Sequence, residues 1–274
     1  MSRNATKTVR EWVKDREIDG HSTFSYAEIG NALPWYSKSV LNTELTRLVR
    51  GGVVTSVHRG FYVTVPVRYK KTGQVPPHYY VDSLFKYLGK PYYMSLLSAA
   101  EIAGASHQGV QVDCVTTVLP RLNNSNAKNP LLKWFYRKSI PEDLIYSRNG
   151  DGGPIRYSCP EFTALDLIQN EHSLGGLGSV ATVLAELVDA IDFARPPSSS
   201  LFSAVSGRTV QRTGYILEEV LGEEEKANIL YNAYASTSSR MEWIFLSPGS
   251  KMAPSGASRK WKVKINADVE VDEL

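Results

Sequence analysis

The sequence predicts a mixed α+β protein with two domains, a small one at the N-terminus followed by a larger α/β-type domain. Helical and strand-like periodicities alternate along the chain, and 274 residues exceed the length of one ordinary domain. Charge is distributed unevenly as well: residues 1–72 contain 12 Lys/Arg and 6 Asp/Glu, a net charge of +6, whereas the whole chain has +3. A basic segment on a mildly acidic chain indicates that this segment contacts nucleic acid.

The overall composition excludes several classes of protein. With 42% hydrophobic and 22% charged residues, the chain has the composition of a globular protein rather than a disordered one. It has no apolar run long enough to span a membrane, and its charged N-terminus is no signal peptide. Cys114 and Cys159 lie far apart outside any CxxC motif, which argues against a disulfide framework or a zinc site. We therefore expect a cytoplasmic protein without a membrane segment, cofactor or metal.

Two helices are predicted before residue 34. Val9, Trp12 and Val13 have the spacing of one helical face, and this helix should end by Gly20. Ser25 and Glu28 have the S-x-x-E spacing of a capping box, in which each side chain satisfies a free backbone N–H at the helix start. A short helix over residues 26–33 should follow and stop near a proline, because proline disfavours helical backbone in the residue before it.

A third helix and a hairpin complete the first domain. Residues 37–50 place apolar side chains on one helical face, at Val40, Leu41, Leu45, Leu48 and Val49. Gly51 and Gly52 should end this helix by allowing left-handed backbone. Residues 53–57 and 61–65 then resemble two strands joined by the turn His58-Arg59-Gly60.

This order of elements is typical of a winged helix-turn-helix over residues 1–72. In that module the third helix enters the major groove of double-stranded DNA, and the hairpin, or wing, lies against phosphates. Asparagine pairs with adenine, arginine with guanine, and serine or threonine with several acceptors. We expect the groove to be contacted by Lys38, Ser39, Asn42, Thr43 and Arg47, and phosphates by Ser37 and Arg59. His58 is a further candidate on the wing.

Other interpretations of these residues stay open. A polar helix face is often only solvated, and some winged helices bind proteins instead of DNA. His58 is equally compatible with an exposed turn residue that contacts nothing. The cations near the first helix either touch the DNA backbone or only improve solubility; these are Arg3, Lys7, Arg10 and Lys14.

The second domain should span residues 73–274, after a linker at residues 68–77 that is basic and rich in Gly and Pro. Periodicity predicts helices over 79–88, 95–104, 162–170, 180–193, 201–221 and 223–235. Strands are predicted over 110–119, 134–136, 144–146, 155–159, 241–246 and 260–265, with loops over 123–129 and 247–258. The result is a mixed α/β or α+β domain large enough to have its own core.

The second domain shows no complete catalytic constellation. Glu161 and Asp166 lie five residues apart across a helix start, and Glu161 is more simply a first-turn carboxylate that the helix dipole favours. His107 beside Gln108 lacks a positioned nucleophile and base. The glycine-rich turn at residues 150–153 is no P-loop, because no GK[ST] opens a helix there. We therefore predict that the protein is not an enzyme.

Two basic groups in this domain are ambiguous. Arg208 and Arg212, four residues apart in the predicted helix 201–221, fit a solvated face better than a grip on phosphates or an acidic partner. In the predicted strand 260–265, alternation places Lys260, Lys262 and Lys264 on one face. That face is more simply solvated, or protects a sheet edge, than a second DNA or protein contact.

Three blocks of the sequence resemble the AbiEi family. They are residues 92–100 followed by His107-Gln108 and 115–117, residues 162–167 followed by 175–177 and 180–187, and residues 211–215. AbiEi proteins are the antitoxins of bacterial AbiE-type abortive-infection toxin–antitoxin systems, which act in phage defence. The resemblance covers nearly the whole chain, including the winged helix.

This resemblance implies a transcriptional autorepressor that binds inverted repeats in its own promoter and counteracts a nucleotidyltransferase toxin. The alternatives are a protein-interaction module that neutralises the toxin by direct binding, or an enzyme that modifies the toxin. The first of these is compatible with DNA binding by the same chain.

Overall fold

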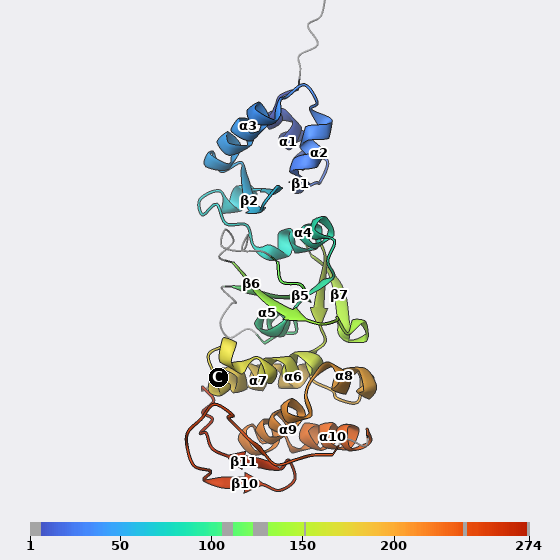
Figure 1. Cartoon of the computed structure of the whole chain (residues 1–274), viewed down its shortest axis with the longest axis vertical. Helices are drawn as coiled ribbons and strands as arrows, with labels where there is room; N and C mark the ends of the chain where they lie inside the picture. Colours follow the sequence, from blue (N-terminus) through green and yellow to red (C-terminus); the bar gives the residue numbers. More distant parts are fainter. Residues whose placement is uncertain (1–6, 106–111, 123–130, 151, 238–239, 273–274) are drawn as a thin grey trace, which may run out of the picture. The chain divides into compact units, whose positions relative to one another are not determined.

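The computed structural model describes residues 7–105, 112–122, 131–150, 152–237 and 240–272, and it confirms the α+β class (Figure 1). The chain divides into two compact units. Unit 1 comprises Met1–Tyr92, Thr117–Lys138 and Ser147–Ile155, and unit 2 comprises Tyr93–Thr116, Ser139–Tyr146 and Arg156–Leu274. The domain division at residues 72 and 73 stays a prediction. Among the described residues, no helix combines the length and apolar composition needed to cross a bilayer.

The first six elements of unit 1 follow the predicted order, with one added strand. They are α1 (Val9–Ile18), β1 (Thr23–Ser25), α2 (Tyr26–Ala32), α3 (Lys38–Arg50), β2 (Val54–His58) and β3 (Phe61–Thr64), drawn in blue in Figure 1. The three strands form an antiparallel sheet in the order β1-β3-β2. The sequence did not predict β1, because a three-residue strand is too short to show alternation.

Capping and a small apolar core hold these elements in place. The Ser25 hydroxyl accepts from the Glu28 N–H at 3.1 Å, and the Glu28 carboxylate accepts from the Ser25 N–H at 2.6 Å, so the predicted capping box is confirmed. A second capping box, Thr8 with Glu11, starts α1. The core between the helices is formed by Val9, Trp12, Val13, Phe24, Ile29, Leu33, Leu41, Leu45, Leu48 and Val54.

A five-stranded sheet and α4 (Val81–Leu88) follow this part of the chain. Its strand order is β6-β5-β4-β8-β7. The strands are β4 (Tyr92–Met94), β5 (Asp113–Val118), β6 (Leu132–Arg137), β7 (Ile145–Gly150) and β8 (Gly153–Ser158). The sequence predicted four of them and missed β4, which pairs in parallel with β8.

Unit 2 is organised around α6 (Pro160–Gln169). Nine of the ten residues of α6 are buried, and it packs on α5 (Leu96–Ile102), α7 (Leu177–Leu187) and α9 (Gly207–Tyr215). The last helix is α10 (Glu224–Ala235), which also packs on α9. Six of the nine buried residues are apolar, and the three buried polar residues are Glu161, Thr163 and Asp166.

The predicted single helix over residues 201–221 was wrong. The chain forms α8 (Ser198–Ala204), α9 and a π-helical segment η7 (Ile216–Val220) instead. Val205 is extended, with φ −134° and ψ 166°, and the Ser206 hydroxyl accepts from the Thr209 N–H at 3.2 Å. Ser206 is therefore the N-cap of a new helix, a function that serine commonly has at helix starts.

The predicted strands near the C-terminus were too long, and the expected loop 247–258 contains a strand. A third sheet has the order β10-β11-β9, formed by β9 (Ile244–Phe245), β10 (Gly256–Ser258) and β11 (Val263–Ile265). Residues 259–262 form turns, and Lys262 has a positive φ of 50°.

The three lysines of this region consequently do not share one strand face. Lys260 Nζ lies 2.7 Å from a Glu218 carboxylate oxygen, and Lys262 Nζ donates to the Met241 carbonyl at 3.0 Å. Lys264 Nζ lies 5.3 Å from the centre of the Phe245 ring. The single cationic face predicted from alternation was wrong, because the chain turns before the strand begins.

Candidate functional site

The exposed side of α3 gathers the residues expected at the DNA groove. Leu41, Leu45 and Leu48 are buried on one side of the helix. Ser37 is the N-cap, and its hydroxyl accepts from the Val40 N–H at 3.4 Å. The predicted groove residues are all exposed; they are Lys38, Ser39, Asn42, Thr43 and Arg47. Their contact with DNA stays a prediction.

The apolar stripe of α3 is narrower than the sequence predicts. Val40 and Val49 were expected in the core, but their exposed fractions are 47% and 37%. Successive residues are rotated by about 100° around the helix axis. Val40, next to Leu41, and Val49, next to Leu48, therefore lie beside the buried leucine stripe rather than in it. Val40 therefore borders the polar face, where its methyl groups are available to a thymine methyl group.

Arg50 is a candidate that the sequence analysis missed. It is exposed and lies seven residues after Thr43, hence on the same helical face. Its position in the last turn of α3 extends the polar face by two turns beyond Thr43. The spacing alone was enough to include it.

The hydrogen bonds of the polar face leave particular groups available. The Thr43 hydroxyl donates to the Ser39 carbonyl at 3.0 Å, so towards DNA it has only its acceptor lone pairs. Within the described residues, no hydrogen bond engages the Asn42 amide, which retains both donors and its acceptor. Asn42 is thus the group on this face that is best suited to bidentate pairing with adenine.

Arg47 is held by an acidic neighbour on its own helix. Its Nη1 lies 2.5 Å from Glu44 Oε1, and 70% of the Arg47 side chain is exposed. An exposed ion pair of this kind contributes little stability, about 0–1 kcal/mol. The ion pair therefore positions the Arg47 guanidinium without holding it strongly, so another hydrogen-bond acceptor can replace the Glu44 carboxylate.

The turn between β2 and β3 is supported from two directions. The Tyr87 hydroxyl, from α4, donates to the Arg59 carbonyl at 3.2 Å, and its ring centre lies 5.2 Å from that of Phe61. A Cβ atom at Gly60, whose φ is 73°, would lie 3.0 Å from the Tyr87 hydroxyl oxygen. The turn is therefore short and closely covered, while the Arg59 side chain remains exposed.

Tyr26 connects this turn to the start of α3. Its N–H donates to the Gly60 carbonyl at 2.8 Å, and its hydroxyl donates to the Lys38 carbonyl at 3.3 Å. The two predicted parts of the DNA surface are thus fixed to one residue at the N-terminus of α2.

The cations of α1 differ in their surroundings. Lys7 pairs with Asp15 at 2.6 Å, whereas Arg10 and Lys14 are exposed. Arg3 lies outside the described residues. Arg16 donates to the Thr23 carbonyl at 3.0 Å and lies over the Trp12 ring, so it holds α1 against β1.

The carboxylates considered for catalysis in unit 2 have structural partners. Glu161 is fully buried, and one of its oxygens accepts from the Asp192 N–H at 2.9 Å. Asp166 accepts from the Asn170 amide at 3.1 Å and from the Tyr93 hydroxyl at 3.5 Å. His107 and Gln108 lie outside the described residues. In the ranges that are described, no three His, Cys, Asp or Glu side chains gather as metal ligands would.

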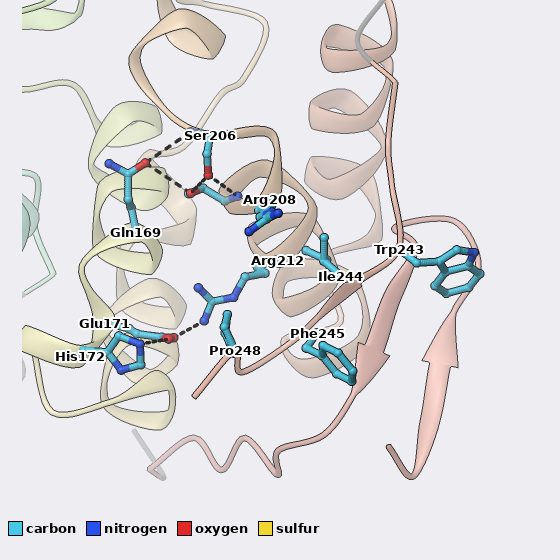
Figure 2. A pocket seen from close by; sticks show the side chains of 11 residues that line it. Gln169, Glu171, His172, Ser206, Arg208, Arg212, Trp243, Ile244, Phe245 and Pro248 are labelled. Atoms are coloured by element: carbon cyan, nitrogen blue, oxygen red, sulfur yellow. Dashed lines mark hydrogen bonds and ion pairs between the residues drawn. The ribbon is translucent and has the colours of Figure 1, made fainter. Parts of the chain in front are cut away.

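Arg208 and Arg212 do not form one solvated face. Arg208 is exposed, but only 9% of the Arg212 side chain is, and it forms an ion pair with Glu171 (Figure 2). Arg212 Nε also donates to the Leu246 carbonyl at 2.6 Å. The solvated interpretation was therefore wrong for Arg212, which connects α9 to Leu246, directly after β9, and to Glu171, after α6.

The α+β fold of this chain is shared with a solved structure. The crystal structure of the RV2827C protein from Mycobacterium tuberculosis matches with a TM-score of 0.68 over 92% of this chain and 89% of that chain. The sequence identity is 13%, so this likeness concerns the fold alone. Among curated proteins, no sequence matches the chain.

A family model matches one part of the chain. Residues 93–219 match the model described as the AbiEi antitoxin C-terminal domain, and the predicted resemblance is confirmed over those residues. This match supports an antitoxin of a toxin–antitoxin system, and an antitoxin family implies a toxin as its partner.

Proposed function

We propose that the chain is a DNA-binding antitoxin that represses its own operon and counteracts a nucleotidyltransferase toxin. One observation supports the DNA-binding part above others: α3 exposes Lys38, Ser39, Asn42, Thr43 and Arg47 together, and Tyr26 fixes the start of α3 to the wing turn. The net charge of +6 on residues 1–72 favours a polyanionic partner.

In this proposal α3 reads bases and the wing contacts the backbone. Asn42 and Arg47 pair with base edges in inverted repeats of the promoter, while Ser37, Arg59 and His58 lie at phosphates. No catalytic step is proposed for the chain, and it acts in the cytoplasm.

The test compares promoter DNA with random duplexes at moderate salt. Tight binding of the protein to its own promoter, and weaker binding of Asn42→Ala, support the proposal. Lys251→Ala is the matched control, since Lys251 is an exposed cation of unit 2. Equal affinity of the wild-type protein for promoter and random DNA contradicts sequence-specific repression.

The antitoxin part is tested separately. Expression of the nucleotidyltransferase encoded beside this gene should stop growth, and co-expression of this chain should restore it. An effect on growth without a stable complex of the two proteins would favour antagonism without contact over direct binding.

A further inference from the structure

A tyrosine of α4 lies against the turn between β2 and β3. The Tyr87 hydroxyl donates to the Arg59 carbonyl at 3.2 Å. The centre of its ring lies 5.2 Å from that of Phe61 and 6.1 Å from that of His58. Tyr87 therefore lies beside the turn on both sides of Gly60, although it comes 28 residues after Arg59 in the chain.

The backbone of this turn is not of the kind that a hairpin favours by itself. His58 pairs with Phe61, so Arg59 and Gly60 form the loop, and the register shifts between Ser56 and His58. The favoured two-residue loops have a positive φ at their first residue, because this backbone matches the twist of the strands. Here the second residue, Gly60, has the positive φ of 73°, and Arg59 does not. Contacts from outside the hairpin therefore help to keep this turn in one conformation.

The helix that carries this tyrosine is itself firmly packed. Three of the eight residues of α4 are buried, and the Phe85 ring stacks on that of Tyr92 with 4.6 Å between their centres. His58 Nδ1 also lies 3.1 Å from the Arg59 carbonyl oxygen, but His58 belongs to the hairpin and moves with it. Tyr87 thus connects the Arg59 carbonyl to a packed helix outside the hairpin.

We propose that Tyr87 is a positioning residue for DNA binding: its hydroxyl holds the backbone of Arg59 so that the guanidinium meets a phosphate. The Arg59 side chain itself is exposed. A turn that is already ordered loses less conformational entropy when the duplex binds. This inference rests on the proposed DNA binding. It adds a residue of α4, beyond the predicted DNA-binding domain at residues 1–72, to those that determine affinity.

The test measures binding of full-length Tyr87→Phe to promoter and random duplexes over a range of salt concentrations. This change keeps the ring beside Phe61 and removes the hydroxyl. Affinity should fall about threefold to tenfold for both duplexes, because one neutral hydrogen bond is lost and a phosphate carries no sequence information. The plot of log affinity against log salt should become shallower, by up to about 0.9 for one phosphate contact.

Two further variants show whether Tyr87 acts through Arg59. Arg59→Ala should weaken binding to all sequences and give the shallower salt dependence, and adding Tyr87→Phe to it should change nothing further. Tyr231→Phe is the matched control, because Tyr231 also lies beside an aromatic ring, 5.4 Å from that of Trp261, but in unit 2. This control should bind DNA as the wild type does.

The outcomes separate this proposal from the proposed function. If Tyr87→Phe binds with the affinity and salt dependence of the wild type, Tyr87 does not position Arg59, although promoter binding stands. Equal losses from Tyr87→Phe in the wild-type and Arg59→Ala backgrounds would likewise refute it. If the wild type binds both duplexes equally, sequence-specific repression fails, and the salt dependence on either duplex still decides on Tyr87. A wild type that binds neither duplex would overturn both. Should Tyr87→Phe lower the thermal midpoint, titrations well below its unfolding transition decide.

Discussion

Two arginines of this chain form ion pairs with opposite physical consequences. The Arg47–Glu44 pair is exposed, so water and salt weaken it and its net contribution to stability is small. The Arg212–Glu171 pair is buried, so removing either partner leaves an uncompensated charge in a medium of low polarity. In the exposed pair, a ligand can replace Glu44 as the partner of Arg47 at little cost. The buried pair instead connects secondary-structure elements.

Replacing Glu44 by Gln should therefore strengthen DNA binding. The change removes a negative charge next to the predicted groove and frees Arg47, whereas Arg47→Ala should cost about 1–3 kcal/mol and relax specificity. Promoter titrations at two salt concentrations measure both effects. Weaker binding of Glu44→Gln, with its thermal midpoint unchanged, would contradict the placement of Arg47 at the DNA.

Asp113 should make the stability of unit 2 depend on pH. Burial raises the pKa of Asp113 from 3.8 to about 6, opposed by the hydrogen bond from the Ser98 hydroxyl at 2.8 Å. The folded state thus binds the proton of Asp113 more tightly than the unfolded chain does. The contribution of this protonation to the free energy of unfolding is therefore complete below about pH 4 and is lost as the pH rises through 6. Its size is on the order of 1–2 kcal/mol after screening by solvent.

Thermal unfolding of the wild type and Asp113→Asn across this range provides the measurement. As the pH is raised from 4 to 7, the thermal midpoint of the wild type should fall relative to that of Asp113→Asn, because asparagine cannot titrate. Parallel curves for the two proteins would show that Asp113 does not titrate in this range.

At the scale of elements, the packing of α9 on the turn at residues 259–262 requires a glycine, Gly214. Gly214 lies against the buried indole of Trp261, and a Cβ at this position would lie 2.1 Å from the ring. Gln211, on the same helix, donates to the Trp261 carbonyl at 2.7 Å. The backbone of α9 at Gly214 therefore packs directly on the indole ring of Trp261, which belongs to the turn at residues 259–262.

Gly214→Ala should consequently destabilise the protein by about 1–3 kcal/mol or more, the usual cost of overpacking a core. Gly30→Ala is the matched control, because Gly30 is also helical and its Cβ would be 3.9 Å from the nearest atom, Leu41 Cδ2. That control should be neutral or stabilising, since alanine is the better helix former. Denaturant unfolding compares the two variants, and equal stability of both would contradict the packing at Trp261.

The same elements show what the sequence could and could not predict. Capping boxes and apolar stripes act locally, so both ends of α2 and α3 and the end of α1 were predicted within one or two residues. The split at Ser206 was also visible locally, as a serine followed by glycine, but the apolar spacing of residues 201–221 concealed it. The burial of Arg212 depends on Glu171 and Leu246, which are distant in sequence. No local pattern identifies such partners, and the same holds for Tyr87 at the wing turn.

At the scale of the whole molecule, the two proposed activities use different residues. The predicted DNA surface lies within residues 37–59, whereas the match to the antitoxin family model covers residues 93–219. Substitutions at Asn42 and Arg47 change exposed side chains of α3 and leave its buried leucines in place. The two activities should therefore be separable by mutation.

The double variant Asn42→Ala/Arg47→Ala should lose repression and retain neutralisation of the toxin. A promoter–reporter fusion measures the first activity. Growth rescue, with both proteins expressed from unrelated promoters, measures the second. Loss of growth rescue at normal protein levels would show that the DNA surface also takes part in neutralisation.

The two hydrogen bonds of Tyr26 have a consequence for the thermodynamics of recognition. Because one residue holds both the wing turn and the first turn of α3, these parts do not have to be ordered separately when a duplex arrives. The conformational entropy of their alignment is already lost during folding, so it does not reduce affinity. Association should then proceed nearly as a rigid-body encounter, fast and sensitive to ionic strength, with little change in the backbone of either part.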